Sequence, residues 1–222
     1  IWTDIDGFHN NDPRYVPNTK PIAHLSFDEA AELSYFGAKI LHPQSVFPAR
    51  KFNVPVRLLD TMNLSASGTL ISGETTNQNQ IVAIAAKDGI TAIRIQSSRM
   101  LMAYGFLRQI FEVFERYKTP IDMITTSEVA VSLTIDQTEN LTEIIKDLET
   151  FGVVETDNNQ SIICIVGDFR KNNHGHATIV SEAVKHIPIR MISYGGSENN
   201  ISLLVPSSYK IEALRSLHNR LF

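Results

Sequence analysis

Cysteines, long apolar runs and clustered basic residues are scarce in this sequence, and each scarcity argues against a class of protein. The 222 residues include a single cysteine, Cys164, which stands within an apolar segment. No disulfide framework can therefore form, and we expect a buried thiol in a reducing compartment. No apolar run reaches the roughly 18 residues of a transmembrane helix, and the first residues do not resemble a signal peptide. We therefore expect a soluble, cytoplasmic protein with no membrane partner.

The charge balance gives no indication of a nucleic-acid partner. The formal net charge is −4, and no basic run interleaves with aromatic residues. Hydrophobic residues make up 43% of the chain, which is enough for a full core, and the length allows one or two domains. The chain begins at Ile1, without Met and inside a strand-like run, so we expect a piece of a longer protein.

The middle of the chain alternates strand and helix patterns in the order β-α-β-β-α-β, which is typical of a ferredoxin-like module. Its expected elements are the strand 90–96, the helix 105–117, the strands 121–126 and 129–136, the helix 141–151 and the strand 152–155. A second copy of the pattern follows, with strands at 161–167, 189–194 and 200–206 and helices at about 175–186 and 209–221. The sequence therefore predicts two small α+β modules in tandem.

The second module lacks one strand, and the first has one to spare. Residues 80–86 form an apolar run ahead of the first module's own opening strand. Pairing this run with the second module would complete its sheet and cover an exposed edge. We therefore expect the first module, residues 90–156, to be inserted in sequence within the second, residues 78–89 plus 157–222.

A polar segment at the end of a strand is the strongest candidate for a binding site. The strand at 121–126 runs into Thr125, Thr126, Ser127 and Glu128 before apolar alternation resumes, with no Gly, Asn or Pro to mark a turn. Hydroxyl oxygens and backbone N–H groups could hold the carboxylate of a small zwitterion, and Asp122 or Glu128 its ammonium. The alternative is a polar edge turn between two ordinary strands.

The first 75 residues differ in character from the two modules. A loop with Asp4, Asp6, Asp12 and Arg14 follows a strand, but Gly7 occupies the fourth loop position counted from Asp4 and not the sixth, so an EF-hand is excluded. Ser26 and Glu29 have the spacing of a capping box and predict a helix over 27–36. Arg14 and Lys39 could contact nucleotide phosphates, or they could form ordinary surface ion pairs.

Three segments, in this order, resemble the C-terminal half of the aspartate kinases. They are Trp-Thr-Asp-Ile-Asp-Gly with the later Asp-Pro-Arg, then Phe-Gly-Ala-Lys-Ile-Leu-His-Pro, then Asp-Met-Ile-Thr-Thr-Ser-Glu-Val. Residues 100–107 and the closing Leu-His-Asn-Arg-Leu-Phe are most similar to the monofunctional lysine-sensitive type. The resemblance implies that residues 1–75 are the C-terminal part of an α/β amino-acid-kinase domain and that the two ferredoxin-like modules are ACT domains.

The resemblance also implies a function. In this family the kinase domain phosphorylates L-aspartate to 4-phospho-L-aspartate with ATP and Mg²⁺, and the ACT domains bind an end-product amino acid for feedback inhibition. L-lysine is the effector implied here, with threonine and methionine as alternatives, and the implied assembly is a homodimer through the ACT domains.

Individual residues match the binding positions of the family. The positions that match ATP-binding residues are Thr3, Asp4, Arg14 and Lys39. The positions that match effector-binding residues are Met100, Gly105, Phe106, Leu107, Asp122, Thr126, Ser127 and Glu128. The chain departs from the family at His9, where Tyr is frequent, and at Ala103, where lysine-sensitive relatives can carry Ser.

The family's N-terminal kinase segment and its aspartate-binding residues have no counterpart in the chain. We therefore expect no catalytic residue, no metal site and no phosphotransferase activity of this chain alone, because phosphoryl transfer depends on a complete set of groups around the phosphates. A second hypothesis is a stand-alone amino-acid-sensing ACT module that carries a kinase remnant.

Overall fold

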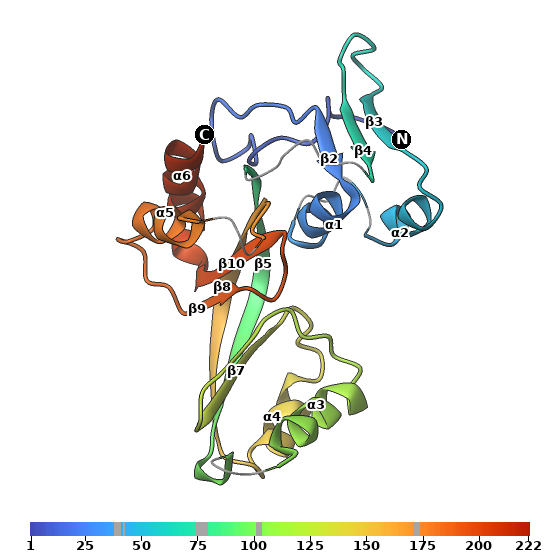
Figure 1. Ribbon diagram of the computed structural model, residues 1–222. Coiled ribbons are helices and arrows are strands. Elements are labelled where there is room, and N and C mark those ends of the chain that lie inside the picture. The colour runs from blue at the N-terminus through green and yellow to red at the C-terminus, as the bar shows by residue number, and fades with distance from the viewer. Residues whose placement is uncertain (38–40, 42, 74–79, 101–103, 171–173) are drawn as a thin grey trace. The chain divides into compact units, whose positions relative to one another are not determined.

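A computed structural model of the chain describes residues 1–37, 41, 43–73, 80–100, 104–170 and 174–222 (Figure 1). The chain divides into two compact units: unit 1 comprises residues 1–87 and 162–222, and unit 2 comprises residues 88–161. The division falls within the two longest strands, β5 (Ile81–Gln96) and β8 (Val153–Gly167). Unit 2 is thus inserted in the sequence of unit 1.

The N-terminal part of unit 1 contains a four-stranded sheet in the order β1-β3-β4-β2. The pairs β1–β3 and β2–β4 are parallel, and β3–β4 is antiparallel. Two helices accompany this sheet, α1 (Phe27–Tyr35) and α2 (Pro43–Lys51). The strands are β1 (Trp2–Thr3), β2 (His24–Ser26), β3 (Val56–Asp60) and β4 (Thr69–Ser72). The sequence did not predict β2 and β4, which are only three and four residues long.

Helix α1 begins and ends as its sequence dictates. The predicted capping box is confirmed: the Glu29 amide donates to Ser26 Oγ at 3.1 Å, and the Ser26 amide donates to the Glu29 carboxylate at 2.7 Å. Gly37 follows the helix at a φ of +122°, and a Cβ on it would lie 1.9 Å from the carbonyl oxygen of Ala86. The glycine of the Phe-Gly-Ala segment therefore lets this helix end approach the backbone of β5.

The C-terminal part of unit 1 joins the first half of β5 and the second half of β8 to β10 (Asn200–Pro206) and β9 (Met191–Tyr194), in the order β5-β8-β10-β9. At the start of β5 the Gln80 carbonyl accepts a hydrogen bond from the Asp168 amide at 2.9 Å, so residues 80–81 lie beside the end of β8. Helices α5 (His176–Ala183) and α6 (Lys210–Leu221) pack together. Val16, from the N-terminal part, belongs to the same apolar core as Leu203 and Leu217.

Unit 2 has the predicted element order β-α-β-β-α-β, formed by β5, α3, β6, β7, α4 and β8. Its strands are ordered β6-β7-β5-β8. Helices α3 and α4 pack together, and Ile110, Leu133 and Ile144 are fully buried in a shared core. The new elements are α3 (Phe106–Arg116), β6 (Ile124–Thr126), β7 (Ala130–Ile135) and α4 (Leu141–Leu148). The predicted ferredoxin-like fold class is therefore confirmed.

Two expected strand breaks were wrong. The runs expected at 80–86 and 90–96 belong to one strand, β5 (Ile81–Gln96), and those expected at 152–155 and 161–167 belong to one strand, β8 (Val153–Gly167). Each long strand contains one residue at positive φ, Gly89 at 76° and Asn159 at 56°. Side-chain hydrogen bonds also link the two polar stretches, from Ser161 Oγ to Asp88 at 2.7 Å and from Thr91 Oγ1 to Asn158 at 3.2 Å. The residues between the expected strands are thus part of continuous paired strands.

Candidate nucleotide and effector sites

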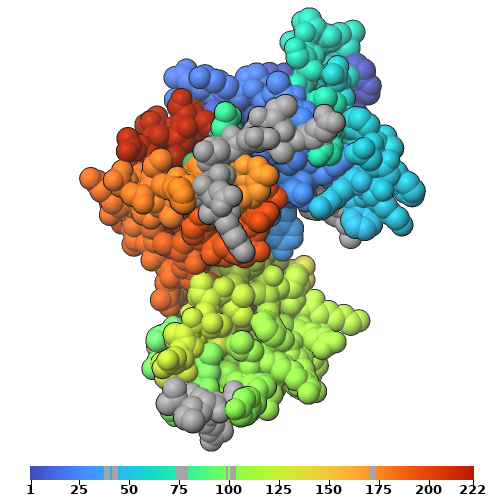
Figure 2. All heavy atoms as spheres, in the orientation of Figure 1, coloured from blue at the N-terminus to red at the C-terminus, as the bar shows by residue number. Residues whose placement is uncertain are grey.

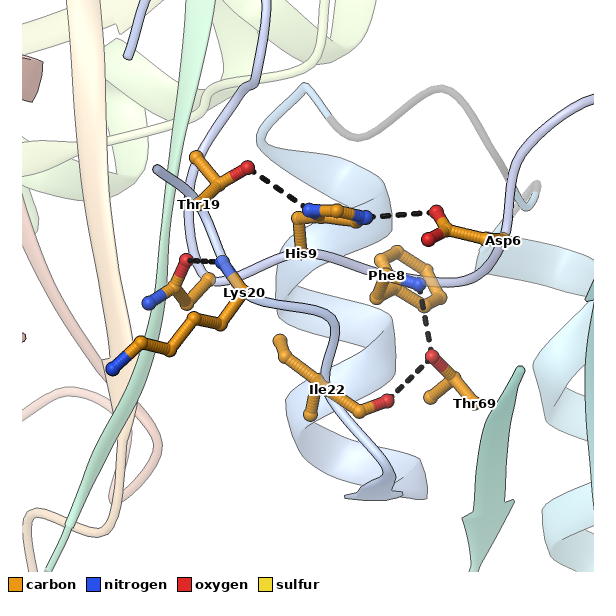
Figure 3. A network of polar contacts seen from close by, with 8 residues as sticks. Asp6, Phe8, His9, Thr19, Lys20, Ile22 and Thr69 are labelled. Atoms are coloured by element: carbon orange, nitrogen blue, oxygen red, sulfur yellow. Dashed lines mark hydrogen bonds and ion pairs between the residues drawn. The ribbon is translucent and has the colours of Figure 1, made fainter. Parts of the chain in front are cut away.

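The loop that follows β1 is fixed at its base by a network of hydrogen bonds (Figure 3). The Phe8 amide donates to Thr69 Oγ1 at 2.9 Å, and that hydroxyl donates to the Ile22 carbonyl at 2.7 Å. The Ile22 amide in turn donates to the Phe8 carbonyl at 2.7 Å. Phe8 is 1% exposed. The loop therefore leaves the sheet and returns to it along a defined path.

His9 closes this loop from inside. Its Nε2 lies 2.8 Å from Asp6 Oδ1 and its Nδ1 lies 2.9 Å from Thr19 Oγ1, as Figure 3 shows. A carboxylate only accepts hydrogen bonds, so in the neutral ring Nε2 carries the proton and the Thr19 hydroxyl donates to Nδ1. Both ring nitrogens are thus occupied by protein groups. His9 therefore holds the loop together.

Thr3 and Asp4 lie where β1 ends beside its parallel neighbour β3. The Thr3 carbonyl accepts from the Thr61 amide and from the Thr61 hydroxyl, both at 2.8 Å. Thr3 Oγ1 donates to Asp4 Oδ1 at 3.1 Å, and Asp4 is exposed. Ligands in α/β folds frequently bind at the carboxyl ends of parallel strands. The polar groups of Thr3 and Asp4 therefore lie where a ligand could bind.

Arg14 lies farther along the same loop and is held by Asp12. The Arg14 Nε–H donates to both Asp12 oxygens at 3.0 and 3.1 Å, and a terminal nitrogen donates to Oδ2 at 2.6 Å. Burial by itself raises the pKa of the Asp12 carboxyl, but the hydrogen bonds and charge of Arg14 outweigh it, so the pKa is lowered. Among the described residues, no hydrogen bond or ion pair joins Arg14 to Thr3 or Asp4, and Lys39 lies outside them.

The predicted effector residues begin at the start of α3. Gly105 precedes this helix at a φ of +81°, and a Cβ there would meet no atom within 4 Å, so glycine is needed for its conformation and not for space. Phe106 is buried and Leu107 is 37% exposed. Met100 and Ile121 pack against the same core as Phe106, so this helix start and the segment leading to β6 meet at one apolar cluster.

Thr126 ends β6, and Ser127 and Glu128 begin the short connection to β7. The Ser127 amide donates to the Ala130 carbonyl at 2.8 Å, and Thr126 pairs with Val131. Thr126, Ser127 and Glu128 are exposed, whereas Asp122 is partly buried and its amide donates to the Thr134 carbonyl at 2.9 Å. The local geometry is thus the polar edge turn that the sequence left open, made without Gly, Asn or Pro. An effector role for these residues stays a prediction.

One further polar link in unit 1 could not be predicted from the sequence. Glu32 of α1 accepts from Ser197 Oγ at 2.9 Å and from Asn200 Nδ2 at 2.6 Å, both near the β9–β10 connection. The partners are 165 and 168 residues apart in the chain, so no local pattern could have predicted the contact. It ties the N-terminal sheet region to the C-terminal part of the unit.

Two family models match parts of the chain. One, described as the amino acid kinase family, matches residues 1–60, and the other, described as the ACT domain, matches residues 163–221. Among known relatives, the chain is 35% identical to "Aspartokinase 3, chloroplastic" of Arabidopsis thaliana, over 100% of this chain and 42% of that protein.

Solved structures of aspartate kinases also match the chain. Aspartokinase III of E. coli in complex with aspartate and ADP is 34% identical, with a TM-score of 0.93 over 100% of this chain and 51% of that chain. Its complex with lysine and aspartate is 33% identical, with a TM-score of 0.86 over 100% of this chain and 51% of that one. A C-terminal regulatory domain of aspartate kinase from Porphyromonas gingivalis W83 is 48% identical, with a TM-score of 0.58 over 63% of this chain and 96% of that domain.

Fold and comparisons together define an amino-acid-kinase element joined to an ACT region. The chain belongs to the aspartokinase family. It spans about half the length of the complete aspartokinases that it matches, 42% of the Arabidopsis protein and 51% of the E. coli chain. Within the described part of the chain, no helix is long and apolar enough to cross a membrane.

Proposed function

We propose that this chain is the nucleotide-contacting end and the amino-acid-sensing region of an aspartate kinase. The parent enzyme would phosphorylate L-aspartate with ATP to give 4-phospho-L-aspartate. The observation that carries this proposal is the match of the whole chain to E. coli aspartokinase III in complex with aspartate and ADP, at a TM-score of 0.93. Residues 1–75 would belong to the kinase domain, residues 90–156 to the first ACT domain, and residues 78–89 with 157–222 to the second.

The groups at the end of β1 suit a nucleotide chemically. Asp4 offers a carboxylate that can accept from ribose hydroxyls, Thr3 offers a hydroxyl, and Arg14 offers a guanidinium that is 74% exposed and can donate to phosphate oxygens. Lys39 would complete this set. Mg²⁺ usually binds through one or two carboxylates together with substrate phosphates, so in the parent enzyme the ATP phosphates would supply part of its ligands.

L-lysine is the proposed effector, because the lysine complex of E. coli aspartokinase III also matches the whole chain. Its carboxylate would lie at backbone amides and hydroxyls near Thr126 and Ser127, and its α-ammonium near Asp122. Its side chain would extend toward Glu128 or Met100, and Gly105, Phe106 and Leu107 would line the site from the start of α3. Lysine can inhibit the enzyme only if it binds one of two enzyme states more tightly than the other.

Calorimetric titration of this chain with lysine, threonine and methionine tests the proposal. We expect saturable binding of lysine and about tenfold or greater weakening in Asp122→Asn, because a charge-assisted hydrogen bond contributes about 1.5–3 kcal/mol. Glu143→Gln, an exposed change on α4 of the same unit, is the matched control and should bind as the parent chain does. Equal lysine binding by both variants would show that the ligand lies elsewhere.

We also propose a homodimer through the ACT region, since open sheet edges are usually covered. Sedimentation at micromolar concentration should give twice the chain mass of 24.8 kDa, and a monomer with and without lysine would contradict it. A cytoplasmic location stays a prediction.

A further inference from the structure

A cavity that the proposed function does not use lies in unit 1, between residues 16–20 and the last turns of α6. Its volume is about 660 Å³, within the usual range for small-molecule sites. The residues that give it a chemical character are Asn18, Lys20, Arg215, His218, Asn219 and Phe222. None of them belongs to the proposed nucleotide or effector sites.

The walls of the cavity are fixed to each other. Arg215 Nε donates to the Tyr15 carbonyl at 2.9 Å, and Asn11 Nδ2 donates to the Leu214 carbonyl at 3.1 Å. Val16 is 2% exposed and lies in the same apolar core as Leu217. Figures 1 and 2 show the dark red end of α6 beside the blue N-terminal segment. The cavity therefore needs no rearrangement to form.

The charged side chains around the cavity have one sign. Lys20 and Arg215 contribute cations to its wall beside His218, and none of the described side chains that line it is acidic, although the whole chain has a net charge of −4. The amides of Asn18 and Asn219 add neutral hydrogen-bond donors. Two clustered cations attract a small anion, and arginine is especially suited to phosphate oxygens.

His218 supplies a second, independent observation. The residue is 8% exposed, and its Nδ1 is buried without a hydrogen-bond partner among the described residues. Buried polar atoms in native proteins nearly always have a partner. Burial, and then the charge of Lys20, lower the pKa of the ring, whose centroid lies 5.3 Å from that of Phe222. A bound anion beside this ring would stabilise its protonated form.

We propose that this cavity binds a small phosphate monoester with a flat, apolar body. The phosphate would lie between Lys20 and Arg215. Two cations match the double negative charge of a phosphate monoester better than the single charge of a carboxylate. The apolar body would contact Phe222 and Val16, and His218 would become protonated when the site is filled.

Phenyl phosphate is the probe, and the ring resonances of His218 report on the site by NMR, with His218→Gln for assignment. We expect a saturable shift and a rise in the pKa of His218. Inorganic phosphate should bind about tenfold more weakly, since it lacks the ring, and benzyl alcohol should not bind. Absence of a saturable shift with phenyl phosphate at millimolar concentrations would overturn the proposal.

Two variants test which groups bind the phosphate. Lys20→Gln and Arg215→Gln should each weaken phenyl phosphate binding by about tenfold, whereas Arg220→Gln, on the same helix but paired with Glu182, should not. Arg215 also donates a hydrogen bond to the Tyr15 carbonyl, so the folding of the Arg215→Gln variant is checked by circular dichroism. If that variant is disturbed, the binding measured for Lys20→Gln decides the test, because Lys20 is exposed. Unchanged binding in Lys20→Gln would contradict the assignment. Arg14→Gln should leave the His218 resonance shift with phenyl phosphate unchanged, because Arg14 does not line the cavity. If phenyl phosphate does not bind, only the cavity proposal fails, and the proposed kinase function is unaffected.

Discussion

Two ionisable residues in unit 1 show how solvent exposure determines the contribution of a charge to the stability of the fold. Arg14 is 74% exposed and paired with Asp12, so solvent screens much of the attraction. His218 is 8% exposed and has Lys20 nearby, so its charged form is disfavoured by burial first and by that charge second. The exposed pair should matter for ligand binding, and the buried ring for stability.

Arg14→Gln should change the free energy of unfolding by less than about 1 kcal/mol, because exposed ion pairs contribute little. It should weaken ADP binding by about tenfold, the effect of losing one charge-assisted hydrogen bond. Arg50→Gln, which removes a similarly exposed pair with Asp28, is the control and should change neither ADP binding nor stability appreciably. Urea denaturation and ADP titration measure the two effects. A loss of ADP affinity in both variants would mean that general charge, and not Arg14, governs binding.

Stability should fall in acid because of His218. Its folded-state pKa is lowered, so as pH falls through the unfolded-state value near 6.5 the unfolded chain binds the proton first. The loss begins there and is complete once the pH is below the folded-state pKa. His218→Gln should therefore show a smaller drop in the free energy of unfolding between pH values about one unit above and below 6.5. The same drop in both proteins would refute this assignment.

At the scale of single elements, helix α1 depends on its cap. Ser26→Ala removes the side-chain acceptor for the Glu29 amide and should cost about 1 kcal/mol of unfolding free energy, as N-cap serines usually do. Ser45→Ala, an exposed change within α2, is the matched control and should stay within about 0.5 kcal/mol of the parent chain. Urea denaturation of both variants checks this. Equal values would mean that packing alone determines where α1 begins.

The start of α3 depends on a left-handed glycine. Gly105→Ala should destabilise unit 2 by about 1 kcal/mol through backbone strain, since φ is +81° and no atom obstructs a methyl group. Gly196→Ala, where space is also open and φ is not left-handed, should be neutral or slightly stabilising. Thermal unfolding distinguishes the two substitutions. If Gly105→Ala were neutral, this helix start would be able to relax, and its role in shaping a site would be doubtful.

At the scale of the whole molecule, we predict that the Glu32 link couples the N-terminal and C-terminal parts of unit 1, so that they unfold together. Glu32→Ala should cost about 2 kcal/mol, because two hydrogen bonds to a carboxylate are lost and Ser197 and Asn200 lose their acceptor. Hydrogen exchange should then increase near residues 197–200. Glu182→Ala, which breaks the exposed pair with Arg220, is the control and should cost less than about 1 kcal/mol.

A double-mutant cycle of Glu32→Ala with Asn200→Ala should give a coupling free energy of at least about 0.5 kcal/mol. Additive effects within error would contradict a direct link. Separate unfolding of residues 1–60 and 162–222 in the parent chain would contradict the cooperative unit.

Local patterns in the sequence were sufficient for much of the fold. The apolar spacing of α3 and α4, the Ser26–Glu29 capping box and the strand at Asn200–Pro206 all depend on near neighbours in the chain, so they could be predicted. The conformation of Gly105 is also local. The family resemblance identified Thr3, Asp4 and Arg14 as candidates, but the bidentate pairing of Arg14 with Asp12 appeared only in the structure.

The sequence by itself therefore determined the class of fold, the order of elements and the family, because periodicity, caps and collinear motifs are properties of the chain. Only the tertiary structure decided that residues 81–96 form one strand, that residues 127–129 make an exposed turn, and that Glu32 meets Asn200. It alone also assembled the cationic cavity beside α6. The physical reason is that backbone pairing, burial and charge proximity depend on residues far apart in sequence, which meet only when the chain has folded.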